Sequence, residues 1–321
     1  MQITILGQHA PFAPLLQGLL GPDHTVEGLS HWPATERLVT DVLVTTKLSA
    51  QDAARLDCRL VQTPSAGVDA IAAEALPEDC PLCNVYEHQV PIAEFIAHAV
   101  LDYCIYPNPN PPPLDEEHWP AQYLGRAFHG EVQGQHAAIV GLGAIGKEAA
   151  RRLRALGMRV TAVTRRQTPE PDVDATHPVE RLIDLLHSVD VLVLCCPLND
   201  ATRGMIGDEA LRALKSSALL INVGRAELVH EQALFDALQQ NRLGRAVLDV
   251  WYRYPAPGQT RLAPASLPFH TLANVRATPH MAGWTSGMIE RRYAFIARNI
   301  ERLAAGEPLQ NILRGQQPHG R

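Results

Sequence analysis

The sequence predicts an α/β protein in which two lobes each contain a doubly wound parallel sheet. Three observations predict this class. Short apolar runs alternate with helical patterns along most of the 321 residues, a glycine-rich turn joins one apolar run to a helix, and a proline-rich stretch divides the chain. A length of this size corresponds to about two domains, and 46% hydrophobic residues suffice for a large core.

Short apolar runs are the strand candidates, because a parallel strand that is buried on both faces is apolar throughout. Polar or alanine-rich helical stretches lie between them, which is the βαβ rhythm of a parallel sheet. The expected strands are residues 3–6, 41–45, 59–62, 137–140, 159–163, 191–195, 218–222, 245–248 and 275–277.

Helical patterns separate these runs. The helix at 92–106 is strongly apolar, and its Glu94 is expected to be a structural carboxylate between the lobes. It ends at the prolines of 107–113, which cannot continue a helix and form a stiff linker. An amphipathic segment with Trp119 follows, and the polar tail at the end of the chain is expected to be loose. Further helices are expected at 180–187, 208–214, 231–241 and 287–304.

A glycine motif follows the strand candidate at 137–140 and precedes an alanine-rich helix and the strand at 159–163. In this G-x-G-x-x-G context the first glycine permits the turn, the second lets the backbone approach a pyrophosphate, and the third lets helix and strand pack closely. The anion is expected at the N–H groups that begin the helix. A tight turn that binds nothing is the alternative interpretation. The phosphate-binding residues are expected to be Gly141, Gly143, Ala144, Ile145 and Gly146.

Composition argues against several classes of protein. The formal net charge of −6 offers no basic field for nucleic acid or anionic lipid. No apolar run reaches the roughly 20 residues that span a bilayer, and the first residues read as a strand rather than a signal peptide. The six cysteines lie mostly in apolar surroundings, which favours a reducing cytoplasm. Cys80 and Cys83 have C-x-x-C spacing, but without a second pair neither zinc binding nor redox chemistry is expected.

Three polar side chains follow strand candidates and should meet at one edge of the sheet. Arg225, Asp249 and His280 come after the runs ending at 222, 248 and 277. Ligands of open α/β sheets bind beyond the carboxyl ends of the strands. There an arginine can hold a carboxylate, and an imidazole can exchange a proton with a hydroxyl or carbonyl oxygen while hydride moves to or from a nicotinamide. This set suits the interconversion of a 2-oxo acid and a 2-hydroxy acid.

Four further motifs, together with this set of residues, resemble those of a known family. They are Pro64-Ser-Ala-Gly-Val-Asp69, Val90-Pro-Ile-Ala-Glu94, Cys196-Pro-Leu-Asn-Asp-Ala-Thr202 and Thr278-Pro-His-Met-Ala-Gly-Trp-Thr285. With them the chain resembles the D-isomer-specific 2-hydroxyacid dehydrogenase family over nearly its whole length. The resemblance implies two Rossmann-like or flavodoxin-like lobes with an interdomain cleft that closes on the substrate, and a homodimer. Residues 1–106 and 286–321 would form the substrate domain, and 107–285 the dinucleotide-binding domain.

The resemblance also implies roles for single residues. His280 would be the acid/base, and Arg225 would bind the substrate carboxylate together with the backbone amides of Ala66 and Gly67. Asp249 would hold the nicotinamide amide. The remaining cofactor contacts would come from Pro197, Thr202, Val223, Gly224, His280 and Gly283.

One position departs from the family pattern. The family usually has Asp-Val-Phe-x-x-Glu-Pro after this strand, and its glutamate pairs with the catalytic histidine. Aligned on Asp249 and Pro255, that position here is Tyr254. A carboxylate would stabilise the imidazolium, whereas a tyrosine can orient the ring but brings no charge at neutral pH. We therefore expect His280 to titrate lower than in its glutamate-paired relatives, with turnover slowed rather than abolished.

The end of the second strand predicts the cofactor. An acidic residue there normally binds the ribose 2′-hydroxyl of NAD. Here Thr164, Arg165 and Arg166 follow the strand, and the next acidic residue is Glu170. Guanidinium groups attract a 2′-phosphate, so we expect NADP(H) to be preferred over NAD(H). Two solvated surface arginines are the alternative interpretation.

Other functions stay open. A phosphite- or formate-type dehydrogenase is one, although the substrate-loop lysine of the phosphite enzyme, which would fall near Ala66, is absent from this sequence. A catalytically weak, cofactor-sensing regulatory protein on the same scaffold is another. Five large side chains near the expected crevice either favour a branched or aromatic 2-oxo acid over glyoxylate or pack the domain interface. They are Trp251, Tyr252, Tyr254, Met281 and Trp284.

Overall fold

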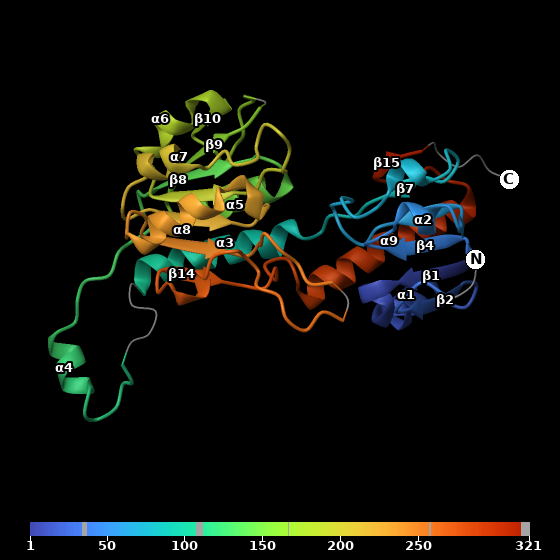
Figure 1. The fold of residues 1–321 in the computed structure, drawn as a ribbon, viewed down its shortest axis with the longest axis horizontal. Helices are drawn as coiled ribbons and strands as arrows, with labels where there is room; N and C mark the ends of the chain where they lie inside the picture. Colours follow the sequence, from blue (N-terminus) through green and yellow to red (C-terminus); the bar gives the residue numbers. More distant parts are fainter. Residues whose placement is uncertain (34–36, 107–111, 166, 257, 316–321) are drawn as a thin grey trace. The chain divides into compact units, whose positions relative to one another are not determined.

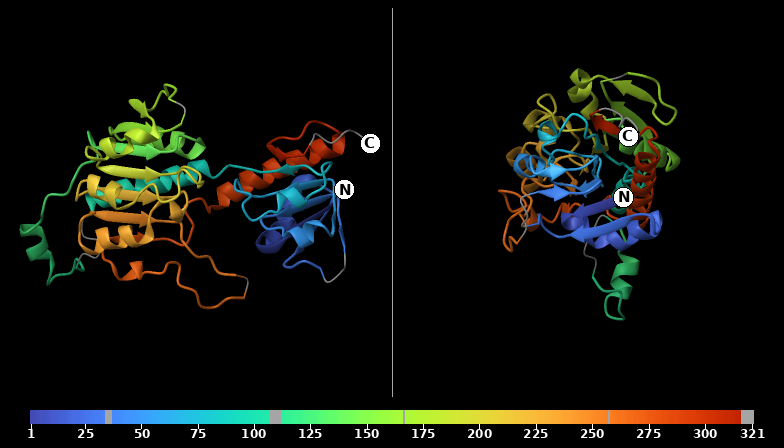
Figure 2. Two further views of the ribbon diagram at one scale, coloured as in Figure 1. Left: turned by 45° about the horizontal axis from the view of Figure 1, so that its top comes forward. Right: turned by 90° about the vertical axis from the view of Figure 1, so that its right-hand side faces the viewer.

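The computed structural model describes residues 1–33, 37–106, 112–165, 167–256 and 258–315 (Figure 1). The chain divides into two compact units. Unit 1 combines Met1–Glu87 with Thr285–Arg321, and unit 2 is His88–Trp284. Each unit contains its own predominantly parallel sheet, as the sequence predicted (Figure 2). No described helix is both long and apolar enough to cross a membrane.

Unit 1 is built on a six-stranded sheet whose strands are all parallel except the C-terminal edge strand, which is antiparallel to its neighbour. On one face, α1 (Ala13–Leu20) packs beside the long C-terminal helix α9 (Ser286–Ala305) over an apolar core that includes Ile5 and Ile296. The two-stranded sheet of β3 (Leu38–Val39) and β5 (Leu56–Asp57) and the short helix α2 (Ala50–Ala53) complete the unit. In sheet order the strands are β15 (Ile312–Arg314), β7 (Leu82–Cys83), β6 (Leu60–Gln62), β4 (Val42–Thr45), β1 (Gln2–Leu6) and β2 (Thr25–Leu29).

Helix α9 has clear start and stop signals. The Thr285 hydroxyl accepts a hydrogen bond from the Met288 N–H at 3.1 Å, which caps the first turn. The helix ends at Gly306, which has a φ of 68° and so takes the left-handed conformation that favours glycine. Between these caps, residues at helical spacing are buried against the sheet of unit 1.

Unit 2 is built on a seven-stranded parallel sheet with helices on both faces. The strand order reverses between β8 and β11, so that the chain winds outward in both directions from this point. In sheet order the strands are β10 (Ala175–His177), β9 (Arg159–Val163), β8 (His136–Val140), β11 (Val191–Leu194), β12 (Leu219–Asn222), β13 (Arg245–Leu248) and β14 (Val275–Ala277).

The two faces of this sheet have separate apolar cores. Alternate residues of the central strands point to opposite sides, so Ile139 contributes to one core and Val140 to the other. Helices α3 (Gln89–Ile105) and α5 (Ala144–Ala155) cover the first face, and α6 (Leu182–Leu186), α7 (Asp208–Ala213) and α8 (Glu231–Gln239) cover the second.

Two features, the tail and the place of α3, differ from the expectations. The tail is not loose throughout, because β15 pairs antiparallel with β7 and Arg314 donates to the Leu76 carbonyl at 2.9 Å. Glu94 is largely exposed and pairs with Arg152 of α5 at 3.6 Å inside unit 2, and its expected role between the lobes stays a prediction. The contacts of α3 place it in unit 2, whereas the boundary expected from sequence follows residue 106. Residues 107–111 of the expected linker lie outside the described residues.

Candidate active site

The glycine turn between β8 and α5 has the shape that a bound phosphate requires. Gly141 has a φ of 100°, and a Cβ there would lie 2.7 Å from the backbone of Cys196. A Cβ on Gly146 would overlap the Gly141 carbonyl oxygen. A Cβ on Gly143, by contrast, would meet no atom within 4 Å. The first and third glycines are therefore required by packing, and the second leaves open space at the start of α5.

The start of α5 provides hydrogen-bond donors toward that space. The first N–H groups of a helix have no partner within the helix, and Gly143 at the N-cap has no side chain to accept from them. Ala144 and Ile145 begin this twelve-residue helix. Since the positive end of the helix dipole lies here too, the turn fits a pyrophosphate.

The carboxyl ends of the parallel strands deliver polar groups to the same edge of unit 2. After β12, Asn222 fixes the turn: its side-chain amide donates to the Arg225 carbonyl at 2.9 Å, and its side-chain oxygen accepts from the Gly224 N–H at 3.1 Å. Arg225 is partly buried, and its guanidinium donates to the Gly224 carbonyl at 2.9 Å. Beyond β11, Thr202 donates to the Pro197 carbonyl at 2.9 Å and closes that loop. Buried Val223 follows β12.

Asp249 organises the segment that carries His280. Its carboxylate is buried and accepts three hydrogen bonds, from the Thr278 hydroxyl at 2.7 Å, the Met281 N–H at 2.7 Å and the Ala282 N–H at 3.0 Å. The Trp251 indole adds a bond to the Thr278 carbonyl at 2.8 Å. The family resemblance assigned Asp249 to the cofactor. In this structure its hydrogen bonds go to the residues on both sides of His280.

His280 and Tyr254 lie in direct contact. The Tyr254 hydroxyl oxygen is 2.8 Å from Nδ1 of His280, so the alignment on Asp249 and Pro255 correctly placed the tyrosine opposite the histidine. The same oxygen accepts the Trp251 N–H at 3.1 Å, which fixes the phenol. His280 itself has a φ of 58°, a left-handed conformation that few non-glycine residues adopt.

The surroundings of His280 favour its neutral form. Burial is the largest cause that lowers the pKa of His280; the Asp249 carboxylate partly opposes it, and the Arg225 guanidinium lowers it further. Burial also raises the pKa of Tyr254, so the phenol stays protonated at neutral pH. A phenol can donate to Nδ1 of a neutral imidazole, which places the ring proton on Nε2, or accept from the Nδ1–H of an imidazolium. Tyr254 therefore orients the imidazole in both its neutral and its protonated state, without favouring the protonated one.

The loop with Ala66 and Gly67 lies in unit 1, between β6 and β7. Its carbonyls are held from within: the Ser65 hydroxyl donates to the Gly67 carbonyl at 2.7 Å, and the Asn84 amide donates to the Ala66 carbonyl at 2.8 Å. Gly67 is exposed. Hydrogen bonds that fix the carbonyls also fix the direction of the neighbouring N–H groups, which suits an amide clamp.

Sequence reasoning missed the residue that anchors this loop. Arg292 of α9 is buried, and its guanidinium donates to the Pro64 carbonyl at 3.0 Å and the Tyr86 carbonyl at 2.9 Å. Burial lowers the pKa of Arg292 to about 10. The only signal in the sequence is an arginine within the apolar stripe of α9, between Ile289 and Ile296, because a buried cation needs a dedicated acceptor.

The end of β9 has the polar groups that the cofactor prediction requires. Thr164 donates its N–H to the His177 carbonyl at 3.0 Å, and Arg165 is exposed. Glu170, the first acidic residue after the strand, forms an ion pair with Lys147 at 2.6 Å. Arg166 lies outside the described residues. No carboxylate among the described residues 159–169 follows β9, and the first one beyond them is paired with a lysine.

Several other expected residues have packing roles. A Cβ on Gly283 would lie 3.3 Å from His88 and 3.4 Å from Ile92, so this glycine lets the segment pack on α3. Trp251 is buried, and the Tyr252 hydroxyl donates to the Val229 carbonyl at 2.9 Å. These two aromatic side chains pack within unit 2. Met281 and Trp284 are about half exposed.

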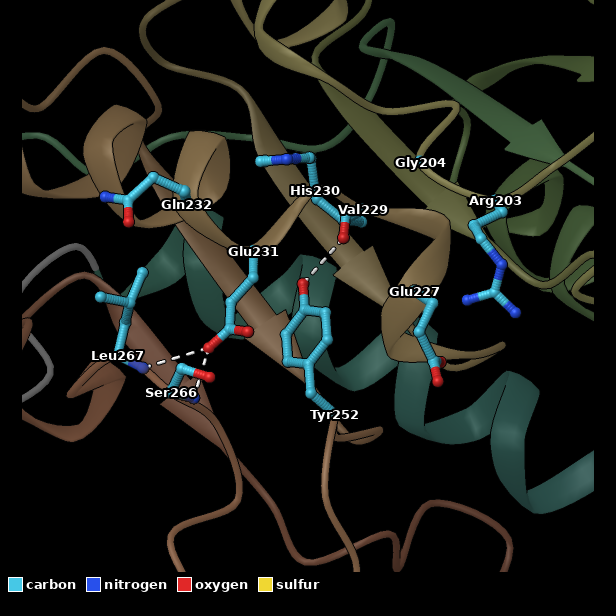
Figure 3. Close-up of a pocket in the computed structure, with 10 residues that line it drawn as sticks. All are labelled: Arg203, Gly204, Glu227, Val229, His230, Glu231, Gln232, Tyr252, Ser266 and Leu267. Carbon is cyan, nitrogen blue, oxygen red and sulfur yellow. Dashed lines mark hydrogen bonds between the residues drawn. The ribbon is translucent and has the colours of Figure 1, made fainter.

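A pocket of about 430 Å³ lies elsewhere in unit 2 (Figure 3). The Glu231 carboxylate lines one side of the pocket and accepts a hydrogen bond from the Leu267 N–H at 3.1 Å. The Tyr252 ring lines another side. Arg203 projects at its rim. Tyr252, one of the large side chains considered for substrate preference, lines this pocket, but His280, Arg225 and the residues expected to bind the cofactor do not.

Comparison with known proteins identifies similar sequences and folds. A family model described as the NAD-binding domain of D-isomer-specific 2-hydroxyacid dehydrogenases matches residues 113–282. Glyoxylate reductase of Thermococcus kodakarensis is 34% identical over 188 residues, 59% of this chain and 53% of that protein. (S)-Sulfolactate dehydrogenase of Chromohalobacter salexigens is 31% identical over 255 residues, 77% of each chain. The matches to several of these curated relatives span about half the relative's length.

Solved structures share the fold over nearly the whole chain. An NADPH-dependent glyoxylate/hydroxypyruvate reductase from Sinorhizobium meliloti, in complex with NADP and sulfate, has a TM-score of 0.77 at 24% identity and covers 98% of both chains. A D-isomer-specific 2-hydroxyacid dehydrogenase from Xanthobacter autotrophicus, in complex with NADPH and MES, has a TM-score of 0.74 at 27% identity and covers 97% of both. An NAD-complexed enzyme from Lactobacillus delbrueckii has a TM-score of 0.78 at 21% identity and covers 98% of this chain and all of its own.

The contact between Tyr254 and His280 generates a prediction about protonation. Tyr254→Glu places a carboxylate against Nδ1 of His280, which stabilises the imidazolium and should raise the histidine pKa by about one unit or more. The imidazole Cε1–H resonance, followed by NMR over a pH titration, measures this shift. In reduction assays the basic limb of the pH–rate profile should move to higher pH in the same variant.

Tyr254→Phe is the matched control, because it removes the hydroxyl without adding charge. Its His280 should titrate no higher than in the wild type. An unshifted His280 pKa in a folded Tyr254→Glu variant would mean that residue 254 does not face the histidine in solution.

Proposed function

Because the chain belongs to the D-isomer-specific 2-hydroxyacid dehydrogenase family, we propose that it transfers a hydride between NADP(H) and a small 2-oxo or 2-hydroxy acid of the D series. The observation that carries this proposal is the loop held by Asp249, which presents His280 beside Tyr254 and within the electrostatic influence of Arg225. A cation for a carboxylate and a proton donor for the adjacent oxygen are the two groups that this chemistry needs from the protein.

The residues of unit 2 fit a nicotinamide dinucleotide. Gly143 leaves open space beside the first N–H groups of α5, where a pyrophosphate would be held, and the loops with Thr202 and Gly224 would line the rest of the site. When bound, the nicotinamide supplies or accepts the hydride. Unit 1, with the amides of Ala66 and Gly67 on the loop anchored by Arg292, would be the substrate domain.

The protein's own groups would then act in three ways. The Arg225 guanidinium binds the substrate carboxylate, and its planar geometry fixes the orientation of the 2-oxo group. His280 exchanges a proton with the 2-oxo oxygen through Nε2, since Nδ1 is occupied by Tyr254. Tyr254 holds the ring and accepts from Nδ1–H whenever the imidazole is protonated. Without a carboxylate partner, the protonated fraction of His280 is small at neutral pH, which slows reduction without preventing it.

A panel of 2-oxo acids tests the proposed reaction. NADPH oxidation should occur with members of this class, with a higher kcat/KM for a branched or aromatic acid than for glyoxylate, because Met281 and Trp284 are exposed near the histidine. Arg225→Gln should lower kcat/KM by about 100-fold or more, since a charged hydrogen-bond partner of the substrate is lost. Arg203→Gln, an exposed arginine at the rim of the separate pocket, is the matched control and should retain activity.

Other outcomes of this panel identify the alternatives. NADPH binding without turnover of any acid would contradict the proposal and favour a cofactor-sensing protein. Turnover of phosphite or formate alone would favour the other dehydrogenase types. Higher kcat/KM for glyoxylate than for the bulkier acids would refute the substrate preference.

The groups after β9 support NADP(H) over NAD(H). We expect kcat/KM for NADPH to exceed that for NADH, and Arg165→Ala to reduce the NADPH value by about 10-fold with little effect on NADH, because a guanidinium interacts with the 2′-phosphate alone. Arg181→Ala, which removes another exposed arginine of unit 2, should change neither value. Equal or better use of NADH by the wild type would contradict the assignment.

The segment around α4 (Trp119–Leu124) supports a homodimer. Figure 1 shows this segment projecting away from the sheet of unit 2, and Leu114, Trp119, Tyr123, Leu124 and Phe128 are exposed on it. An apolar segment of this kind typically marks a protein–protein interface. Light scattering should give the mass of two chains for the wild type and one for a Trp119→Ser/Phe128→Ser double variant. A monomeric wild type would exclude this assembly.

A further inference from the structure

Two cysteines of unit 1 that are distant in sequence lie in contact. The Sγ atoms of Cys58 and Cys80 are 3.3 Å apart, and both thiols are unoxidised. Cys58 precedes β6 and Cys80 precedes β7, which are neighbouring parallel strands paired at Val61 and Leu82. Cys80 is buried, whereas Cys58 is partly exposed, so a small reagent has access to the pair from one side.

This pairing differs from the one that the C-x-x-C spacing suggests. Cys83 belongs to the apolar core under α9, and Cys80 belongs to the core on the other side of the sheet. The partner of Cys80 is therefore Cys58. Metal binding by this pair has no support in the structure, because no group of three metal-binding side chains occurs among the described residues.

We propose that Cys58 and Cys80 form a dithiol that a peroxide converts into a reversible disulfide. The sulfur atoms need to approach from 3.3 Å to about 2.05 Å, which small side-chain rotations can achieve. Cys58 is the partly exposed sulfur of the pair, so it is the one that a peroxide reaches first, and Cys80 lies behind it as the second sulfur. Burial raises the pKa of each cysteine outside this pair, so Cys83, Cys104, Cys195 and Cys196 stay protonated.

The reaction balances with one molecule of peroxide. The Cys58 sulfur loses its proton and attacks a peroxide oxygen, the O–O bond breaks, and the second oxygen takes the proton and leaves as water, so that Cys58 becomes a sulfenic acid. The Cys80 sulfur then attacks the sulfur of Cys58 and loses its proton, and the hydroxyl takes that proton and leaves as a second water. Two thiols are oxidised by two electrons, the peroxide is reduced to two waters, and a dithiol reductant reverses the bond.

The disulfide would close the segment from Cys58 to Cys80, which contains the Ser65–Gly67 loop. This part of the inference rests on the proposed function, because it assigns the loop to substrate binding. Oxidation would fix the strand ends on both sides of that loop. The KM for the 2-oxo acid should therefore differ at least two-fold between the reduced and oxidised protein, while the affinity for NADPH, which unit 2 binds, should not change.

Mass spectrometry of the full chain tests the proposal. The reduced protein, treated with hydrogen peroxide, should become lighter by two hydrogen atoms, and proteolysis without reduction should release a cross-linked peptide pair with Cys58 and Cys80. Dithiothreitol should reverse the change. The oxidised protein should melt about 5 °C higher, because the cross-link constrains the unfolded chain.

Two variants and a control make the result specific. Cys58→Ser and Cys80→Ser should each lose the cross-link and the shift in melting temperature. Cys104→Ser, which removes a buried thiol in unit 2, should keep both. Absence of the Cys58–Cys80 peptide, or oxygen addition at either cysteine without a cross-link, would overturn the proposal. A cross-link with an unchanged KM for the 2-oxo acid would overturn the proposed effect of the disulfide on the Ser65–Gly67 loop. If the protein turned over no 2-oxo acid, the proposed function would fail, but mass spectrometry would still decide whether the disulfide forms.

Discussion

One buried carboxylate holds the candidate site together. Asp249 receives three hydrogen bonds from the segment between Thr278 and Ala282, and His280 is the residue in the middle. A buried charge is tolerated only when such donors surround it. Removing one hydrogen-bond partner would cost about 1–3 kcal/mol, because the remaining buried group would be left without a hydrogen bond. The left-handed backbone at His280 persists because these bonds fix the residues on either side of it. The position of the histidine thus depends on a residue that follows a different strand, β13.

This arrangement separates the position of the imidazole from its charge. Asp249 fixes the backbone, Tyr254 fixes the ring, and neither group pairs with the imidazole as a salt-bridging carboxylate would. Burial and Arg225 both disfavour the imidazolium. The relatives' usual glutamate would combine orientation and charge in one group. Here the histidine is oriented by a neutral partner, and its protonation depends on the groups around it.

Much of unit 2 could be predicted from the sequence. The strands at 159–163 and 245–248 have the predicted bounds, because parallel strands buried on both faces are continuous apolar runs with sharp ends. The strand at 275–277 also has the predicted bounds, although it is a partly exposed edge strand. The edge strands β2, β10 and β15 were missed, since their residues are only partly buried and carry a weak pattern. Contacts between distant segments were also out of reach. The Cys58–Cys80 pair has no local signal, and the arginine in the apolar stripe of α9 does not reveal that it binds the Pro64 carbonyl, whereas Tyr254 could be placed by alignment on its neighbours.

The influence of Arg225 on His280 has a thermodynamic consequence. A bound substrate carboxylate would neutralise much of the guanidinium charge that now disfavours the imidazolium. Carboxylate binding and protonation of the histidine are then linked functions, and each strengthens the other. An anionic 2-oxo acid would be taken up together with a proton, and its affinity would increase as the pH falls toward the histidine pKa. Although His280 has no permanent carboxylate partner, binding of the substrate carboxylate would itself favour the protonated histidine that reduction requires.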